Sequence, residues 1–222
     1  MGRRSKKLSK DEQQEVEEWI YQNNTEETRM TDTMTITVKC KTENQKLLVN
    51  AIKEKEVIIC SGPAGTGKTY LACAEALRLI NRYAKYKKIV IVKSVTTLKN
   101  EEIGFLKGNL REKMEPFMFS FVHNFEKLVG QAITSKLREL KTIEEMPIAY
   151  MRGINLDRSI IIVDEAQNIS QENMRTILTR LGKDSKMIFL GDERQQDSKG
   201  GNGLTFLIDH FSHIEEIGCV QF

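Results

Sequence analysis

Short runs of apolar residues recur along the chain and predict buried strands. Three runs are rich in β-branched residues and a fourth resembles them: Val57 to Cys60, Ile89 to Val92, Ile160 to Val163 and Met187 to Leu190. Each run is continuous rather than alternating, as expected for a strand that is buried on both faces of a parallel sheet. From Thr33 to Cys40, in contrast, apolar residues alternate with Thr and Lys, which predicts a half-exposed edge strand.

Apolar residues at helical spacing lie between these runs. One helix is predicted from Thr69 to Tyr83, and another follows an N-capping Ser170 and ends before Gly182. A third is predicted from Glu115 to Ile133, with Pro116 in its first turn. One face of this third helix carries Phe117, Phe121, Phe125 and Leu128, and it packs either into the core or against another subunit.

The alternation of strands and helices predicts an α/β fold. Right-handed crossovers place helices on both sides of a mostly parallel sheet, so we expect three layers. Ligands of such folds bind outside the carboxyl ends of the strands. With 222 residues the chain suits one domain, which we place at residues 31–222, preceded by a polar appendage at residues 1–30.

Charge and cysteine content restrict the class of protein. The net charge of +3 is too small to indicate a nucleic-acid partner by itself. Basic residues cluster only near the N-terminus, from Arg3 to Lys10, either as a solvated tail or as a nucleic-acid-binding arm. The four separated cysteines predict buried free thiols. Because neither a membrane span nor a signal peptide is evident, we expect a cytoplasmic protein with no membrane partner.

A glycine-rich segment after the first apolar run matches the pattern G-x-x-x-x-G-K-[ST]. Its residues are Gly62, Pro63, Ala64, Gly65, Thr66, Gly67, Lys68 and Thr69. Between a strand and a helix, such a loop wraps backbone N–H groups around phosphates and adds the positive end of the helix dipole. Lys68 would contact the β and γ phosphates, and the Thr69 hydroxyl would bind Mg²⁺. The segment therefore predicts a site for ATP and Mg²⁺.

Two carboxylates follow the run Ile160 to Val163. Asp164 would hold the magnesium through its water shell, and Glu165 would orient or deprotonate an attacking water. Two amides complete the predicted site. Gln195, after the run that ends at Leu190, would contact the γ phosphate, and Gln45 would present a donor and an acceptor to the adenine edge, favouring ATP over GTP.

These residues resemble the PhoH-like ATPases, relatives of the first RecA-like domain of superfamily-one helicases. Seven stretches carry the resemblance, in the family's order: TENQK at 42–46, SGPAGTGKT at 61–69, GFLKGNLREKMEPF at 104–117, YMRG at 150–153, IIIVDEAQN at 160–168, LTRLG at 178–182 and GDERQQD at 191–197. The resemblance implies ATP hydrolysis, a single RecA-like P-loop core, homo-oligomeric rings such as hexamers, and binding of RNA or single-stranded DNA.

Two features depart from the family's pattern. Lys93-Ser94-Val95 stands where the family usually carries an arginine-containing loop. The sequence also reaches Phe222, on a last strand predicted from Gly218, without the arginine-bearing tail that usually follows. The PIN nuclease domain of some relatives is not seen either, so we do not expect RNA cleavage by that route.

Hydrolysis by a single RecA-like domain raises the question of a missing arginine. In helicases, charge that develops on the transferred phosphate is stabilised by an arginine from outside the first domain. Because only one such domain fits in this sequence, we expect the arginine to come from a neighbouring subunit. Four arginines qualify: Arg152, Arg175, Arg180 and Arg194. Arg180 is preferred because the sequence LTR is shared with the family.

The predicted function is therefore an ATPase that couples ATP turnover to binding of RNA or single-stranded DNA. The loop from Lys93 to Lys99 is a predicted contact with the nucleic-acid backbone. Two other classes remain open. A small-molecule kinase shares the phosphate loop but normally has an arginine-rich lid. A non-hydrolysing nucleotide switch would tolerate replacement of Glu165 by Gln.

Overall fold

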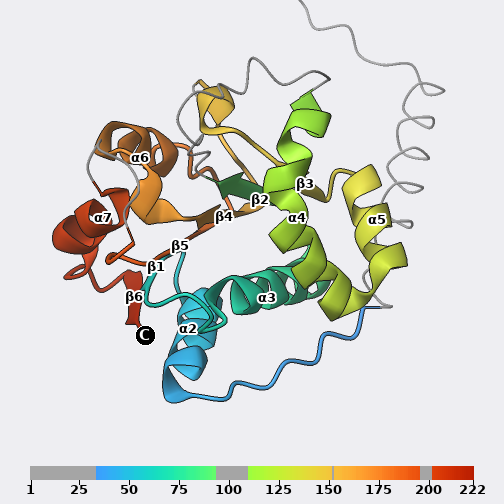
Figure 1. Ribbon diagram of the computed structural model, residues 1–222, viewed down its shortest axis with the longest axis horizontal. Coiled ribbons are helices and arrows are strands. Elements are labelled where there is room, and N and C mark those ends of the chain that lie inside the picture. Colours follow the sequence, from blue (N-terminus) through green and yellow to red (C-terminus); the bar gives the residue numbers. More distant parts are fainter. Residues whose placement is uncertain (1–33, 94–109, 152, 196–201) are drawn as a thin grey trace, which may run out of the picture. The chain divides into compact units, whose positions relative to one another are not determined.

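The computed structural model describes residues 34–93, 110–151, 153–195 and 202–222 (Figure 1). Three predictions lie outside the described residues: the polar appendage at 1–30, the nucleic-acid contact beyond Lys93, and Arg152. The chain from Ile36 to Phe222 forms one compact unit. None of its described helices has the length and apolar character needed to cross a membrane.

A six-stranded sheet forms the centre of this unit. Its strands are ordered β3-β2-β4-β5-β1-β6, and every described pairing is parallel. The strands are β1 (Val57–Ser61), β2 (Lys88–Lys93), β3 (Ile143–Glu145), β4 (Ser159–Asp164), β5 (Lys186–Gly191) and β6 (Ile217–Gln221). Each of the four predicted apolar runs lies within one of them, which confirms the parallel sheet. The buried positions of β4 and β5 explain why their sequences are continuous rather than alternating.

Helices cover both faces of the sheet, so the fold has three layers (Figure 1). The α-helices are α2 (Glu43–Glu54), α3 (Lys68–Arg82), α4 (Leu110–Val129), α5 (Gln131–Glu139), α6 (Gln171–Leu178) and α7 (Gly203–Phe211), and the short 3-10 helices are η2 (Ile148–Met151) and η3 (Ala166–Asn168). One core joins the face of the sheet that carries Ile59, Ile161 and Phe189 to Met174 of α6 and Leu204 of α7. On the other face, α3 contacts the sheet and packs against α2 and α4.

Local sequence signals account for the helices that flank the site. The Ser170 hydroxyl accepts a 3.3 Å hydrogen bond from the Asn173 backbone N–H, which confirms the predicted N-cap of α6. The Thr42 hydroxyl caps α2 in the same way, accepting from the Gln45 backbone N–H at 3.3 Å. This cap fixes where α2 begins, and therefore where Gln45 lies in its first turn.

Two element predictions were wrong. Within the predicted edge strand, the described residues form no strand, although Ile36 and Val38 are half-buried and Thr37 is exposed. The segment is instead held to α3, where the Arg78 guanidinium donates to the Ile36 carbonyl from Nη2 at 3.1 Å. Alternation of buried and exposed residues arises beside a helix as readily as beside a strand.

The helix predicted from Glu115 was also misplaced. It begins at Leu110 and ends at Val129, so Pro116 lies inside it rather than in its first turn. Gly130, with φ of 84°, then separates α4 from α5. Phe121 and Phe125 are fully buried, which favours the core for these two side chains. The cysteines are free thiols as predicted, but only Cys60 and Cys73 are buried, whereas Cys40 is half-buried and Cys219 is exposed.

Candidate nucleotide-binding site

The phosphate loop connects β1 to α3, as its sequence pattern requires. Gly67 has φ of 89°, a left-handed conformation that glycine adopts without a steric penalty, and its carbonyl accepts the first helical bond from Leu71 at 2.9 Å. Backbone N–H groups at the start of α3 have no partners within the helix and are available to an anion. The loop therefore has the backbone form of a phosphate site.

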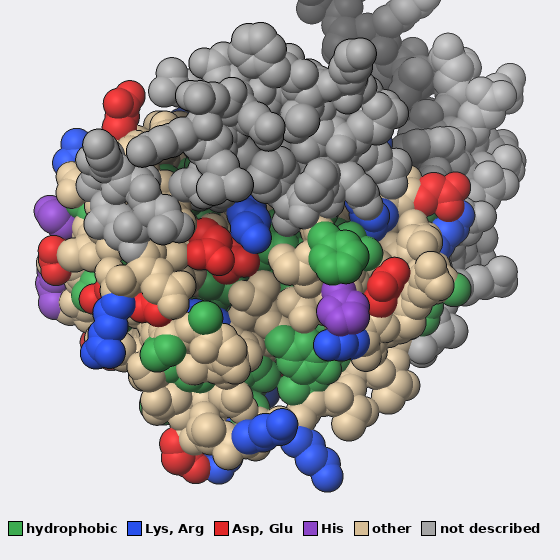
Figure 2. Space-filling model, viewed as in Figure 1, with side chains coloured by type: hydrophobic (Ala, Val, Ile, Leu, Met, Phe, Trp, Pro, Cys, Tyr) green, Lys and Arg blue, Asp and Glu red, His purple; other side chains and the backbone are tan. Residues whose placement is uncertain are grey.

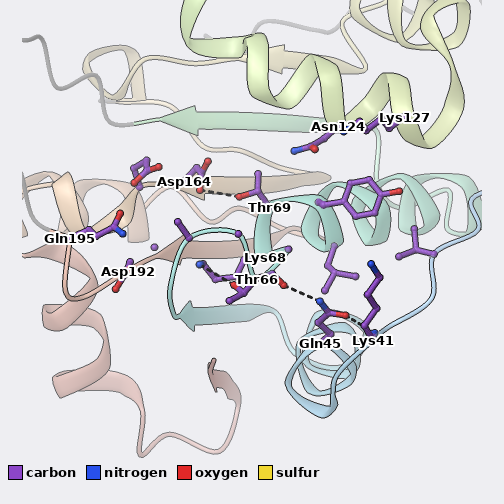
Figure 3. A pocket seen from close by; sticks show the side chains of 18 of the residues that line it. Lys41, Gln45, Thr66, Lys68, Thr69, Asn124, Lys127, Asp164, Asp192 and Gln195 are labelled. Carbon is purple, nitrogen blue, oxygen red and sulfur yellow. Dashed lines mark hydrogen bonds between the residues drawn. The ribbon is translucent and has the colours of Figure 1, made fainter.

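The amine of Lys68 lies inside the curve of the loop. Its Nζ donates to the carbonyl of Gly62 at 2.6 Å and to that of Pro63 at 2.8 Å, and it lies 3.4 Å from the Thr66 hydroxyl (Figure 3). The side chain is buried. A buried positive charge surrounded by carbonyl dipoles and helix N–H groups is matched to a polyanionic ligand.

Asp164 and Thr69 meet across the gap between β4 and the loop. The Thr69 hydroxyl donates to Asp164 Oδ1 at 3.4 Å (Figure 3). Burial, with a further contribution from the charge of Glu165, raises the pKa of the Asp164 carboxyl to about 6, whereas Lys93 and Lys68 act in the opposite direction. The predicted neighbourhood of Thr69 and Asp164 is therefore present.

The donor set around Asp164 fits magnesium. A hydroxyl and a carboxylate are hard oxygen ligands, and Mg²⁺ is usually held by one or two such groups together with waters and substrate phosphates. Among the described residues, no cluster of three or more His, Cys, Asp or Glu side chains offers a complete protein cage. Thr69 and Asp164 would therefore hold a magnesium ion that arrives with the nucleotide.

Glu165 leaves β4 in a strained conformation. Its φ of 54° is left-handed, which costs free energy for a residue with a side chain and persists only where the surroundings enforce it. The carboxylate accepts a 2.6 Å hydrogen bond on Oε2 from the Gln167 side-chain amide. The strained turn and this bond together set the direction of the carboxylate.

Gln167 was not assigned a role from the sequence. Its side chain is buried, and its Oε1 accepts a 3.1 Å hydrogen bond from the Asp192 backbone N–H, at the end of β5. A Cβ at Gly191 would lie 2.4 Å from this oxygen, so glycine is required there to admit the amide. The signal that could have pointed to Gln167 was its place in the sequence DEAQ, two residues after Glu165.

Gln45 braces the loop. Its Nε2 donates to the Thr66 carbonyl at 2.9 Å, and its Oε1 accepts from the Lys41 backbone N–H at 2.6 Å (Figure 3). Both ends of the amide are thus engaged within the protein, one on the phosphate loop and one on the segment before α2. The predicted contact with adenine stays a prediction.

A cleft with a volume of 810 Å³ runs past these residues, within the size range of nucleotide-sized ligand sites. Predicted side chains at its wall include Gln45, Lys68, Thr69, Asp164, Glu165 and Gln195. Further lining residues were missed by the sequence analysis: Lys39, Lys41, Tyr70, Asn124, Lys127 and Asp192. Sequence patterns gave no signal for Asn124 and Lys127, because only the packing of α4 against α3 brings that helix to the cleft.

Arg175 and Arg180 make their contacts away from the cleft in a single chain. Arg194, in contrast, directly precedes Gln195 at the cleft wall and lines a second pocket with Gly62 and Pro63. Arg180 donates from Nη1 to the Ile154 carbonyl at 3.1 Å, and its own carbonyl accepts from Leu156, which precedes the first residue of β4. Arg180 therefore lies near the amino-terminal end of β4, whereas Asp164 is at the carboxyl end of the same strand. Arg175 packs over the Phe206 ring at 5.2 Å. The role predicted for Arg180 thus stays a prediction that requires a second subunit.

Comparisons with known proteins agree with the resemblance described above. A family model described as PhoH-like protein matches residues 37–222. The chain is 39% identical to a PhoH-like protein of Mycobacterium leprae over 183 residues, which cover 82% of this chain and 52% of the relative. It is 37% identical over 186 residues to a PhoH-like protein of Bacillus subtilis, which cover 83% of this chain and 58% of that relative. The chain spans about half the length of these relatives.

Solved structures with a similar arrangement come from phage and helicase proteins. The UvsW helicase from Bacteriophage T4 aligns over 90% of this chain and 67% of that chain, with a TM-score of 0.45 and 11% identity. A large terminase from a thermophilic bacteriophage, in complex with ADP, aligns over 82% of this chain and 44% of the terminase chain, with a TM-score of 0.43 and 11% identity. Likeness at this level does not extend to function.

Proposed function

Because this chain belongs to the PhoH-like protein family and carries a phosphate loop beside two strand-end acids, we propose that it binds ATP with Mg²⁺ and hydrolyses it. The observation that supports this most directly is the 3.4 Å contact between Thr69 and Asp164, beside the buried amine of Lys68. A phosphate-binding loop and a carboxylate that converge on one cleft suit a magnesium nucleotide better than any uncharged ligand.

Each side chain has one part in the proposed reaction. Lys68 would release its carbonyl partners and neutralise charge on the β and γ phosphates. Magnesium, when held by Thr69 and Asp164, would supply further neutralisation of the phosphate charge. Glu165 would orient a water molecule for in-line attack and accept its proton, and Gln167 would keep that carboxylate in place. Gln195 lines the cleft, where it would contact the γ phosphate.

We propose that ATP turnover is coupled to RNA or single-stranded DNA and that the active form is a homo-oligomeric ring. The positions of Arg175 and Arg180 support the second point, because both make their contacts away from the cleft in one chain. A neighbouring subunit would then supply the arginine that stabilises the transferred phosphate.

Nucleotide binding and turnover of three proteins test the ATPase proposal. We expect the wild type to bind and hydrolyse Mg-ATP, Glu165→Gln to bind it but lose at least about a hundredfold in turnover, and Lys68→Ala to bind it weakly. A wild type that binds ATP without turning it over would favour the nucleotide-switch alternative. Calorimetry that detects no binding of Mg-ATP would contradict the proposed function itself.

A further inference from the structure

An exposed aromatic residue projects from α4, whose opposite face is in the core. Phe119 is 75% exposed, whereas Met118, Phe121 and Phe125 on the same helix are buried. Its ring is stacked on that of His123, with the two planes 4° apart and the centroids separated by 6.3 Å. Two parallel rings are thus presented to solvent one helical turn apart.

Basic and polar side chains continue this stripe down to the nucleotide cleft. Phe119, His123 and Lys127 follow one another at intervals of four residues, and all three are exposed. Lys127 and Asn124 also line the cleft. Figure 2 shows hydrophobic, histidine and basic side chains in this succession over α4. We refer to Phe119, His123 and Lys127 as the α4 stripe.

We propose that the α4 stripe binds single-stranded nucleic acid, with a base stacked on Phe119 and His123 and a backbone phosphate at Lys127. Flat exposed rings beside a basic groove are the combination that holds single strands without sequence preference. Lys39 and Lys41 line the same cleft as Lys127 and add positive charge to it. This inference rests on the proposed function for its partner class but assigns the contact to specific residues.

The size and polarity of the stripe argue against a second copy of this chain as its occupant. Stable protein interfaces bury about 800 Å² on each partner around an apolar centre. Phe119 is the one large hydrophobic residue of α4 that is exposed in the described part of the helix, and its neighbours Ser120, His123 and Lys127 are polar and exposed. A small pair of parallel rings among polar groups suits a base, which needs only one flat face.

The location of the stripe connects strand binding to the nucleotide. Lys127 belongs to both the stripe and the cleft wall, so a phosphate of either ligand would contact the same amine or its immediate neighbour Asn124. We therefore expect the affinity for a single strand to differ between the ATP-bound and the nucleotide-free protein.

Binding of fluorescent oligo(U) RNA and oligo(dT) DNA to the full chain, without nucleotide, tests this site. We expect Phe119→Ala to weaken binding of at least one polymer by roughly tenfold or more, as loss of one stacked base does, and Phe119→Tyr to retain it. Phe119→Leu keeps the apolar contact but not the stacking, so it should behave like the alanine variant. Basal ATP turnover should stay unchanged in all three, because Phe119 does not line the cleft.

Tyr83→Ala is the matched control. Tyr83 is also an exposed aromatic residue beside a cation, with the Arg82 guanidinium 5.4 Å from its ring, but it follows the end of α3 remote from the phosphate loop. We expect this variant to bind both polymers like the wild type. Thermal unfolding of every variant verifies that the fold is retained, and His123→Ala provides a second, independent change in the stripe.

Four results would overturn the inference. Equal affinities of the wild type, Phe119→Ala and His123→Ala would show that no base stacks there, and wild-type affinity in Phe119→Leu would show that the contact is merely apolar. Altered sedimentation of Phe119→Ala in the absence of nucleic acid, with unchanged oligonucleotide affinity, would make the stripe a contact between subunits. A wild type that binds neither polymer also refutes it, and ATP turnover in the same samples tests the ATPase proposal separately.

Discussion

Gln167 and Glu165 are joined by a 2.6 Å hydrogen bond from the buried amide of the first to the carboxylate of the second. The other end of the same amide accepts the Asp192 backbone N–H at 3.1 Å. One side chain therefore connects Glu165, the acid that follows β4, to the backbone of Asp192, the residue that follows β5. The Glu165 carboxylate is therefore held by an amide that is itself bonded to the backbone after β5.

Replacement of Gln167 by Ala should release this carboxylate. We expect turnover to fall by about ten- to a hundredfold with the affinity for Mg-ATP almost unchanged, because the residue positions Glu165 without contacting the nucleotide. The unpaired Asp192 N–H should also lower the free energy of unfolding by about 1–3 kcal/mol. Steady-state kinetics, nucleotide titration and thermal unfolding measure these effects.

Gln171→Ala provides the control for this variant, because Gln171 is an exposed glutamine at the start of the next helix, α6. It should leave turnover and stability near wild-type values. Wild-type turnover in Gln167→Ala at equal stability would show that the hydrogen bond to Glu165 has no part in the reaction.

Asp164 should make the nucleotide-free protein less stable at neutral pH. Its pKa is raised to about 6 in the folded state, so between about pH 4 and pH 6 the folded chain holds a proton that the unfolded chain has lost. The free energy of unfolding contributed by this group therefore decreases as the pH rises through that window. Asp164→Asn should remove the cost of burying this charge. The free energy of unfolding should then rise by up to about 3 kcal/mol above pH 6 and stay unchanged below pH 4.

Thermal unfolding across this pH range, with and without Mg-ATP, measures the effect. Without ligand, Asp164→Asn should unfold at a higher temperature than the wild type at pH 7. With Mg-ATP the order should reverse, since the variant lacks the proposed magnesium ligand. Asp209→Asn, at an exposed acid on α7, should show neither change. A variant that is less stable than the wild type at pH 7 without ligand would contradict the prediction.

The phosphate loop was predictable because its function imposes a local pattern. The glycine spacing, Lys68 and Thr69 are all read within eight residues, and the flanking strand and helix are independently visible from apolar periodicity. The contact between Thr69 and Asp164 followed from topology alone, because parallel strands present their carboxyl ends at one edge.

Residues brought to the cleft by packing were not predictable in the same way. Lys127 lies on a helix whose sequence shows an apolar face, and nothing in that periodicity specifies what the opposite face contacts. The edge strand was predicted wrongly because alternation indicates that one face of a segment is buried but does not identify what buries it. Here the neighbour is the helix α3, whose Arg78 donates a hydrogen bond to the Ile36 carbonyl. Pro116 suggested a helix start, but the helix begins earlier, at Leu110.

Gln45 offers a test of nucleotide selectivity. If its amide turns to adenine when ATP binds, Gln45→Ala should raise the KM for ATP more than that for GTP and shrink the preference by about tenfold. If the amide only braces Thr66 and Lys41, the KM values for ATP and GTP should rise by the same factor. Glu43→Ala serves as the control because that side chain is 79% exposed in the same helical turn. Steady-state kinetics with both nucleotides distinguishes the two roles.

A site shared between subunits can be tested by mixing two inactive variants. Lys68→Ala should disable the phosphate loop of its own chain, and Arg180→Ala should disable the site of its neighbour if Arg180 is the missing arginine. Each variant alone should then turn over ATP at least about a hundredfold more slowly than the wild type, a loss typical of one removed charge-stabilising donor. Co-assembled rings would contain some sites with an intact Lys68 facing an intact Arg180, so turnover should partly return on mixing.

The matched control is Arg175→Ala, which removes a guanidinium that packs over Phe206 and should leave the protein active. Full activity of Arg180→Ala alone would rule out this arginine, and two inactive variants that stay inactive after verified co-assembly would rule out the shared site.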